Sequence, residues 1–136
     1  MTDLLSPFRG PLTASPVEPI ARFVPAAVYA CAIVFASSIP GEEITFQVDD
    51  RIAHFVEYFI FGLLLLFAAA GVRGGTGRLA PAAILAFVAV FALADEYHQS
   101  FVPQRDASLK DWVFDMIGAS AAVLGARRLA APREAQ

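Results

Sequence analysis

The chain has 136 residues, of which 57% are hydrophobic and 17% are charged, and its formal net charge is -3. Soluble domains are about 45–50% hydrophobic and about 25% charged, so this composition favours lipid over water as the surrounding medium. The length allows one domain and not two, and the small negative charge argues against nucleic acid as a partner.

The first segment, residues 1–19, contains several prolines and has no basic start followed directly by an apolar core. We therefore expect a flexible N-terminal segment and no cleaved signal peptide. Four apolar stretches follow, over residues 23–39, 52–72, 79–97 and 111 to about 127. Each is close to the roughly 17–25 residues that a membrane-spanning helix requires.

None of the four stretches carries a polar face along its full length, as a helix of a soluble bundle would. The alternative, a soluble helical bundle, would require far more surface charge than this chain has. We therefore predict an all-α protein, an integral membrane four-helix bundle that occupies residues 20–128. A short C-terminal tail, residues 129–136, follows it.

The basic residues predict the direction of the four helices. Most of them lie in three regions that share one side of the membrane: Arg9, Arg22, Arg73, Arg78, Arg127, Arg128 and Arg133. Positive residues favour the cytoplasm, so both termini are expected to be cytoplasmic. The loops that follow the first and third helices then lie on the opposite side.

Polar and ionisable residues gather at the outer ends of three predicted helices. They are His54, Glu57 and Tyr58 on the second, Asp95, Glu96, His98 and Gln99 on the third, and Asp111 and Asp115 on the fourth. Helical spacing places those of the second helix on one face, and those of the third, except Glu96, on one face. On the fourth helix the acids continue into a stripe of small residues, Gly118, Ala122 and Gly125, which lets membrane helices approach closely.

Several of these acids are expected to serve a site. Asp95 and Glu96 lie at the carboxyl end of a helix, where the helix dipole disfavours anions, so a cation or a proton must offset their charge. Glu57 and Asp115 lie a turn or more inside their helices, where ionisable groups are costly and usually face the bundle interior. The alternative is buried polar bracing between helices.

Other polar residues have a simpler interpretation as helix caps. Asp50 precedes the second helix and can cap its free amides, while Ser108 can cap the fourth. Ser108 and Asp111 together match the spacing of a capping box. Asp111 is therefore either a capping residue or part of the site.

The chemistry of the cluster suits acid–base work and anion binding. Arg105, in the turn "VPQRDAS", offers a bidentate fork for a phosphate or a carboxylate. We expect no metal or other cofactor, because a hydrogen-bonded His–carboxylate pair is the commoner arrangement. The alternative is a divalent metal, since two helical pairs place possible ligands on one face each: His54, Glu57, Asp95 and His98.

The strings "RIAHFVEYFIFGLLL" and "ADEYHQSFVPQRDASLKDWVFDMIGA" resemble the VanZ-like family of small bacterial membrane proteins. The resemblance covers about residues 51–125. The family pattern falls on His54, Tyr58, Asp95, Glu96, His98, Gln99, Pro103, Arg105, Ser108, Asp111 and Gly118. Two positions depart from it: Gln104 stands where Gly often precedes the Arg, and Asp115 stands where Asn is common.

The resemblance implies a protein of the bacterial inner (plasma) membrane, in a family whose founding member is associated with teicoplanin resistance. With the orientation above, the polar site would face the periplasm or the outside. Its expected partners are membrane lipids and an envelope lipid or cell-wall precursor, most naturally one with a phosphate-bearing headgroup. The sequence gives no prediction of the oligomeric state.

Three functions remain open at this point. The first is an enzyme with Glu57, Asp95 or His98 as acid or base, and with a set of binding residues: His54, Tyr58, Glu96, Gln99, Arg105, Ser108, Asp111 and Asp115. The second is a non-catalytic binder or modulator of an antibiotic, a lipid or a partner protein. The third, a proton-coupled carrier, is weaker because the polar residues stop near one face and form no path across the membrane.

Overall fold

The computed structural model describes residues 20–44, 48–70 and 79–130, which form helices and turns and no strand. The elements are α2 (Val24–Ser37), the short 3-10 helix η2 (Gly41–Glu43), α3 (Asp50–Ala70), α4 (Leu79–Gln99) and α5 (Leu109–Ala130). The predicted all-α fold class is therefore confirmed for these residues. The expected flexible segment 1–19 and residues 131–136 of the expected tail lie outside the described part of the chain.

Side-chain caps decide where α3 and α5 begin. The Asp49 carboxylate accepts a hydrogen bond from the backbone N–H two residues later, at 3.0 Å. Asp49 therefore makes the capping bond that the sequence suggested for Asp50, which is the first residue of α3 itself. The hydroxyl of Ser108 accepts a bond from the N–H of Lys110 at 3.1 Å, so the expected cap of α5 is present.

Two of the helices are long and apolar enough to cross a membrane, Asp50–Ala70 and Pro81–Gln99. The first apolar stretch gives a helix of 14 residues, α2, which spans about 21 Å at about 1.5 Å per residue. Helix α5 has 22 residues but carries charged side chains at both ends, which lower its hydropathy. Length and hydropathy together therefore identify two of the four predicted spans, α3 and α4.

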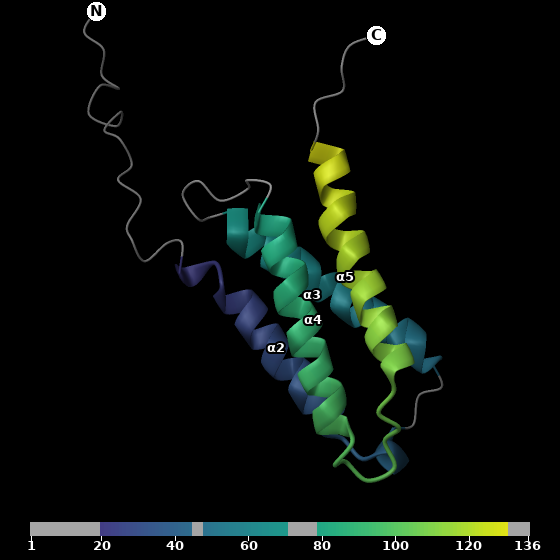
Figure 1. Ribbon diagram of the computed structural model, residues 1–136. Helices are drawn as coiled ribbons and strands as arrows, with labels where there is room; N and C mark the ends of the chain where they lie inside the picture. Colours follow the sequence, from purple (N-terminus) through teal and green to yellow (C-terminus); the bar gives the residue numbers. More distant parts are fainter. Residues whose placement is uncertain (1–19, 45–47, 71–78, 131–136) are drawn as a thin grey trace, which may run out of the picture.

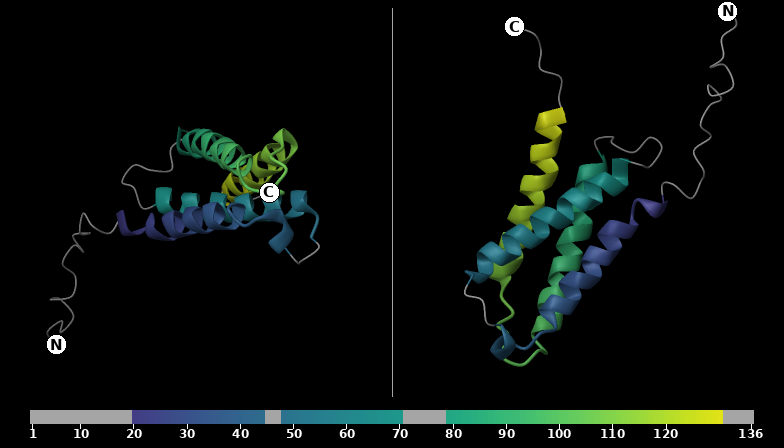
Figure 2. Two further views of the ribbon diagram at one scale, coloured as in Figure 1. Left: turned by 90° about the horizontal axis from the view of Figure 1, so that it is seen from below. Right: turned by 180° about the vertical axis from the view of Figure 1, so that it is seen from behind.

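Successive helices run in opposite directions, and the bundle has two layers. Figure 1 shows α2 and α4 ending at the bottom of the view, where α3 and α5 begin. Seen from below, α2 and α3 form one layer, and α4 and α5 form the other (Figure 2). Helix α3 contacts all three other long helices and packs most extensively against α5. The four polar helix ends consequently meet at one end of the bundle.

Small residues bring α3 and α5 together where they cross. A Cβ atom added to Gly118 of α5 would overlap the carbonyl oxygen of Phe55 in α3. A Cβ atom on Gly62 of α3 would lie 3.1 Å from the Cβ of Ala122. The expected packing stripe on α5 is therefore present at Gly118 and Ala122. It does not extend to Gly125, because no atom of the described residues lies within 4 Å of its Cβ position.

The core of the bundle is apolar, and so is much of its outer surface. Tyr58, Phe61, Ile33, Val88 and Val123 are almost completely buried. All four long helices also expose large apolar side chains, among them Val28, Phe35, Ile60, Leu63, Phe67, Phe87, Val90, Leu93, Ile117 and Leu124. Water-soluble monomers rarely expose so much contiguous apolar surface, whereas lipid-facing helices do.

Candidate functional site

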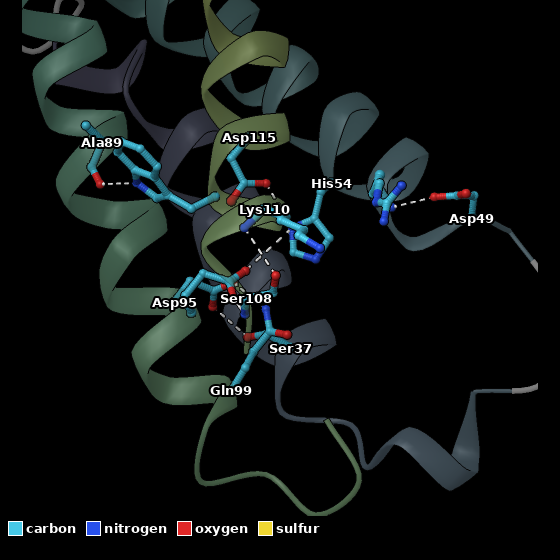
Figure 3. Close-up of polar contacts among 12 residues, drawn as sticks. Ser37, Asp49, His54, Ala89, Asp95, Gln99, Ser108, Lys110 and Asp115 are labelled. Carbon is cyan, nitrogen blue, oxygen red and sulfur yellow. Dashed lines mark hydrogen bonds and ion pairs between the residues drawn. The ribbon is translucent and has the colours of Figure 1, made fainter. Parts of the chain in front are cut away.

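Buried polar side chains collect at the end of the bundle where α2 and α4 end and α3 and α5 begin. They are Ser37, His54, Asp95, Glu96, Gln99, Asp111 and Asp115. Figure 3 shows that side chains from all four helices point into this region. Because the helices alternate in direction, residues about sixty positions apart in the chain become neighbours, such as His54 and Asp115.

His54 and Asp115 form the centre of this polar end. The His54 Nδ1 atom lies 2.8 Å from an Asp115 carboxylate oxygen, and only 1% of the Asp115 side chain is exposed. The same His54 nitrogen lies 3.9 Å from the Oε1 atom of Glu96. The pair joins α3 to α5, and Glu96 brings α4 to the same point. A buried imidazole therefore faces two buried carboxylates.

Asp95 braces α4 against α2. One of its carboxylate oxygens accepts a hydrogen bond from the Ser37 hydroxyl at 2.7 Å. The other accepts one from the Gln99 amide at 3.1 Å, one helical turn further along α4. Both oxygens are thus paired, which matches the bracing alternative for this residue. Ser37 was missed in the sequence because a serine at the end of an apolar stretch has the same pattern as an ordinary helix end.

Glu96 and Ser108 connect the end of α4 to the start of α5. The Glu96 Oε2 atom accepts a hydrogen bond from the backbone N–H of Ser108 at 2.7 Å. Its Oε1 atom is buried and has no hydrogen-bond partner among the described residues. Asp111 is also buried, in the first turn of α5, where the helix dipole favours an anion.

Arg105 contacts the carboxyl end of α2. Its Nε donates to the carbonyl of Ile39 at 3.0 Å, and its Nη2 donates to the carbonyl of Ala36 at 2.7 Å. Cations are stabilising at helix carboxyl ends, and backbone carbonyls there lack partners within the helix. The sequence predicted Arg105 as an anion clamp, and that stays a prediction; it did not indicate the capping role, because carbonyl partners leave no pattern in the sequence.

The loop that carries Arg105 is held against the loop after α2. The backbone N–H of Gly41 donates to the carbonyl of Pro103 at 3.1 Å, and a Cβ atom on Gly41 would overlap the Gln104 carbonyl. Gln104 has a φ of 56°, in the left-handed region that favours glycine. This explains why a Gly is expected before the Arg, the position at which the chain departs from the family pattern.

His98 lies apart from His54. It is exposed, and its Nε2 is 2.9 Å from the Ser38 hydroxyl. The four residues of the alternative metal set, His54, Glu57, Asp95 and His98, are therefore not brought together as a group. Two other sets of possible ligand atoms lie within 4.8 Å of one another: His54 with Glu96 and Asp115, and His54 with Asp50 and Asp111.

A cavity of about 430 Å³ adjoins this polar end. Polar residues from three helices and a loop line it: Ser37, Asp50, His54, Glu57, Gln99 and Arg105. Tyr29 and aliphatic side chains complete the wall. Glu57 is half-buried and faces this space, whereas Tyr58 lies in the core against Phe61 and Phe91. The predicted residues thus divide into a cavity wall, a buried His–carboxylate cluster and a core aromatic.

The model of the VanZ/LLP1 family matches residues 32–130. The matched range begins within α2 and includes all of α3, α4 and α5, so it contains every residue described above as part of the polar end. The search of curated proteins and the search of solved structures each gave no match.

Proposed function

The chain belongs to the VanZ/LLP1 family, and from that premise we propose that it is a multi-pass protein of the bacterial plasma membrane with a site for an anionic headgroup at its outer end. The headgroup carries a phosphate or a carboxylate and belongs to an envelope lipid or a cell-wall precursor. This would place the protein among the envelope functions to which glycopeptide resistance also belongs.

The apolar surface supports the membrane environment. Exposed aliphatic and aromatic side chains occur on α2, α3, α4 and α5, and α3 and α4 are long enough to span the hydrocarbon layer. We propose that α2 and α5 cross the membrane as well, because they pack alongside these two helices (Figure 2). The distribution of arginines supports a polar end on the outer side and both termini in the cytoplasm.

The cavity carries the proposal for the site. It combines apolar walls, suited to a lipid chain, with the Arg105 guanidinium, which can bind an anion. Arg105 uses its Nε and one Nη2 hydrogen on backbone carbonyls, so its remaining N–H groups are available to a ligand oxygen. The capping bonds to α2 fix the direction in which the guanidinium points. Preorganisation of this kind favours binding.

Glu57 is the residue to which we assign acid–base chemistry, because it faces the cavity and is half-buried there. Asp95 and His98, the other two residues with the required chemistry, instead have side-chain partners at the end of α2, Ser37 and the following Ser38. We assign them a supporting role, in which they hold α2 and α4 together beside the cavity.

The test of anion binding uses the full-length protein in nanodiscs of phosphatidylcholine, titrated with undecaprenyl phosphate. Arg105→Gln should weaken binding about tenfold or more, since one hydrogen bond to a charged group contributes about 1.5–3 kcal/mol. Arg51→Gln removes an exposed arginine from the same end and should leave the affinity unchanged. Equal affinity in the wild type and Arg105→Gln would contradict the proposal.

A second function, binding without catalysis, is favoured by one observation. The carboxylate of Asp95 is fully paired, as a structural group would be, and is not free to exchange a proton with a ligand. The Glu57→Gln variant separates the two functions. Where expression of the wild type changes teicoplanin susceptibility, a variant that binds the headgroup normally but lacks this effect shows that Glu57 acts chemically; if both properties persist, the protein is a binder.

A further inference from the structure

Three possible metal-ligating side chains converge in the interior of the polar end, each from a different helix. His54 comes from α3, Glu96 from α4 and Asp115 from α5, and one ligand atom of each lies within 4.8 Å of the others. The exposed fraction of the side chain is 7% for His54, 7% for Glu96 and 1% for Asp115. We propose that these three residues bind a divalent transition-metal ion, with Zn²⁺ as the first candidate.

The orphaned oxygen of Glu96 points to a ligand. Its Oε1 atom is buried, lacks a hydrogen-bond partner among the described residues and lies 3.9 Å from His54 Nδ1. A buried polar atom without a partner costs free energy, so such an atom requires an explanation. A metal ion between Glu96, His54 and Asp115 would satisfy it.

Protonation of the Glu96 carboxylate would not give its Oε1 atom a hydrogen-bond partner. The Oε2 atom accepts the Ser108 N–H, so an added proton would reside on Oε1. There it would become a donor, and the described residues offer Oε1 no hydrogen-bond partner. The Ser108 bond also fixes the direction of the carboxylate, as groups behind a metal ligand commonly do.

The charge of the surroundings favours a cation. Besides Glu96 and Asp115, the carboxylates of Asp50 and Asp111 lie within reach of His54. One imidazole thus faces four acids, of which Glu96, Asp111 and Asp115 are buried. Buried charges require a compensating partner, and a divalent ion supplies more positive charge than an imidazolium does.

The distances and the ligand types fit a transition metal. Ligand atoms at about 2.1 Å from a tetrahedral Zn²⁺ lie about 3.4 Å apart, between the observed 2.8 and 3.9 Å to His54 Nδ1. Imidazole nitrogen suits Zn²⁺ and its neighbours, whereas Mg²⁺ and Ca²⁺ prefer oxygen alone. Three protein ligands would leave one tetrahedral position open. His54 also lines the cavity that contains Arg105, so metal binding and headgroup binding are measured separately.

The experiment measures metal content and affinity in the purified full-length protein. After dialysis against a chelator, the protein is titrated with Zn²⁺ by calorimetry, with Mn²⁺ and Mg²⁺ in parallel. We expect one Zn²⁺ per chain, with binding in the order Zn²⁺, Mn²⁺, Mg²⁺. Glu96→Gln and Asp115→Asn, which keep the side-chain shape, should each weaken Zn²⁺ binding tenfold or more.

Matched controls come from the other members of the polar end. Asp95→Asn alters the residue before Glu96 and should leave Zn²⁺ affinity unchanged, as should His98→Gln. Loss of Zn²⁺ binding in these two variants, with retention in Glu96→Gln, would overturn the proposal. It would favour the set of His54, Glu57, Asp95 and His98 instead. Absence of saturable Zn²⁺ binding in the wild type would overturn it outright.

Cobalt gives a readout that does not depend on the variants being stable. Co²⁺ added to the chelated wild type should produce visible absorption bands that saturate at one equivalent and disappear when Zn²⁺ is added. An absorption spectrum unchanged from that of Co²⁺ in buffer would contradict a protein-bound site. Headgroup binding by the chelated protein is measured separately, so failure of either proposal is distinguishable from failure of the other.

Discussion

Asp115 is the most deeply buried acid among the described residues, and its hydrogen-bond partner there is His54. The 2.8 Å contact joins α3 to α5 across 61 positions of sequence. Removing one partner of a buried pair is far more costly than replacing both, because the remaining group is left without compensation. The stability of the polar end therefore depends on this pair.

Asp115→Ala should lower the free energy of unfolding by about 3–5 kcal/mol, because it leaves His54 without its partner and opens a cavity. Asp115→Asn retains a hydrogen-bonding side chain of equal size and should cost less. Reversible unfolding in mixed detergent micelles, followed by circular dichroism, measures both. An alanine variant as stable as the wild type would show that the pair does not hold the helices together.

For individual residues, the sequence predicted which polar side chains lie at the same end of the bundle, because helix direction and helical spacing determine this. It did not predict their partners. The pairing of His54 with Asp115, and not with Glu57, depends on how the α3 and α5 faces meet, which spacing along one helix does not specify. Ser37 and Ser38 were missed entirely, since α2 showed no charged residue to draw attention.

Among the elements, the crossing of α3 and α5 sets the depth of the buried cluster. Gly118 allows the two helices to touch just one turn below Asp115, and the carbonyl of Phe55 occupies the space that a side chain would need. Close approach of this kind is typical of membrane helices with small residues at the contact. The His54–Asp115 distance follows from this contact.

Gly118→Ala should destabilise the protein, despite the higher helix propensity of alanine, because its Cβ atom would overlap the α3 backbone. Gly125→Ala is the matched control on the same helix. It meets open space and should raise stability by up to about 1 kcal/mol through helix propensity alone. Thermal unfolding of both variants is measured in the same detergent. Equal shifts of the unfolding temperature in the same direction would contradict the close crossing of α3 and α5.

The turn between α4 and α5 contains a second backbone constraint. Gln104 adopts a positive φ, which costs a non-glycine residue about 1–2 kcal/mol. Gln104→Gly should therefore raise the unfolding temperature, whereas Gln104→Ala keeps the strained backbone and should not. If alanine and glycine have equal effects, the 3.3 Å amide contact to Glu42 determines the result instead.

For the molecule as a whole, the proposed orientation in the membrane would give the polar end access to a headgroup on the outer side. In a Cys31→Ser background, Asp106→Cys should react with a membrane-impermeant maleimide added to intact spheroplasts. Arg128→Cys, near the other end of α5, should react only after the membrane is permeabilised. Both side chains are exposed, so a difference in labelling reports their sides and not their burial.

The whole-molecule prediction from sequence succeeded for the helical class and for the family, because long apolar runs and the "ADEYHQSFVPQR" string are strong signals. The number of spans was harder to predict. Apolar runs define α3 and α4 clearly, but α2 ends after 14 residues and α5 combines its apolar centre with acids that serve the polar end. Residues selected for a site weaken the hydropathy signal of the helix that carries them.

The contacts between the two loops at the polar end have a consequence for amide exchange. The Gly41–Pro103 backbone bond and the Arg105 bonds connect the end of α2 and the loop after it to the loop after α4, and the Ser37–Asp95 bond connects α2 to the last turns of α4. Opening this end requires all of them to break together, so its slow-exchanging amides should exchange as one cooperative unit. The end of α2 and the loop around Arg105 would then show a common opening free energy, although they are more than sixty residues apart in sequence.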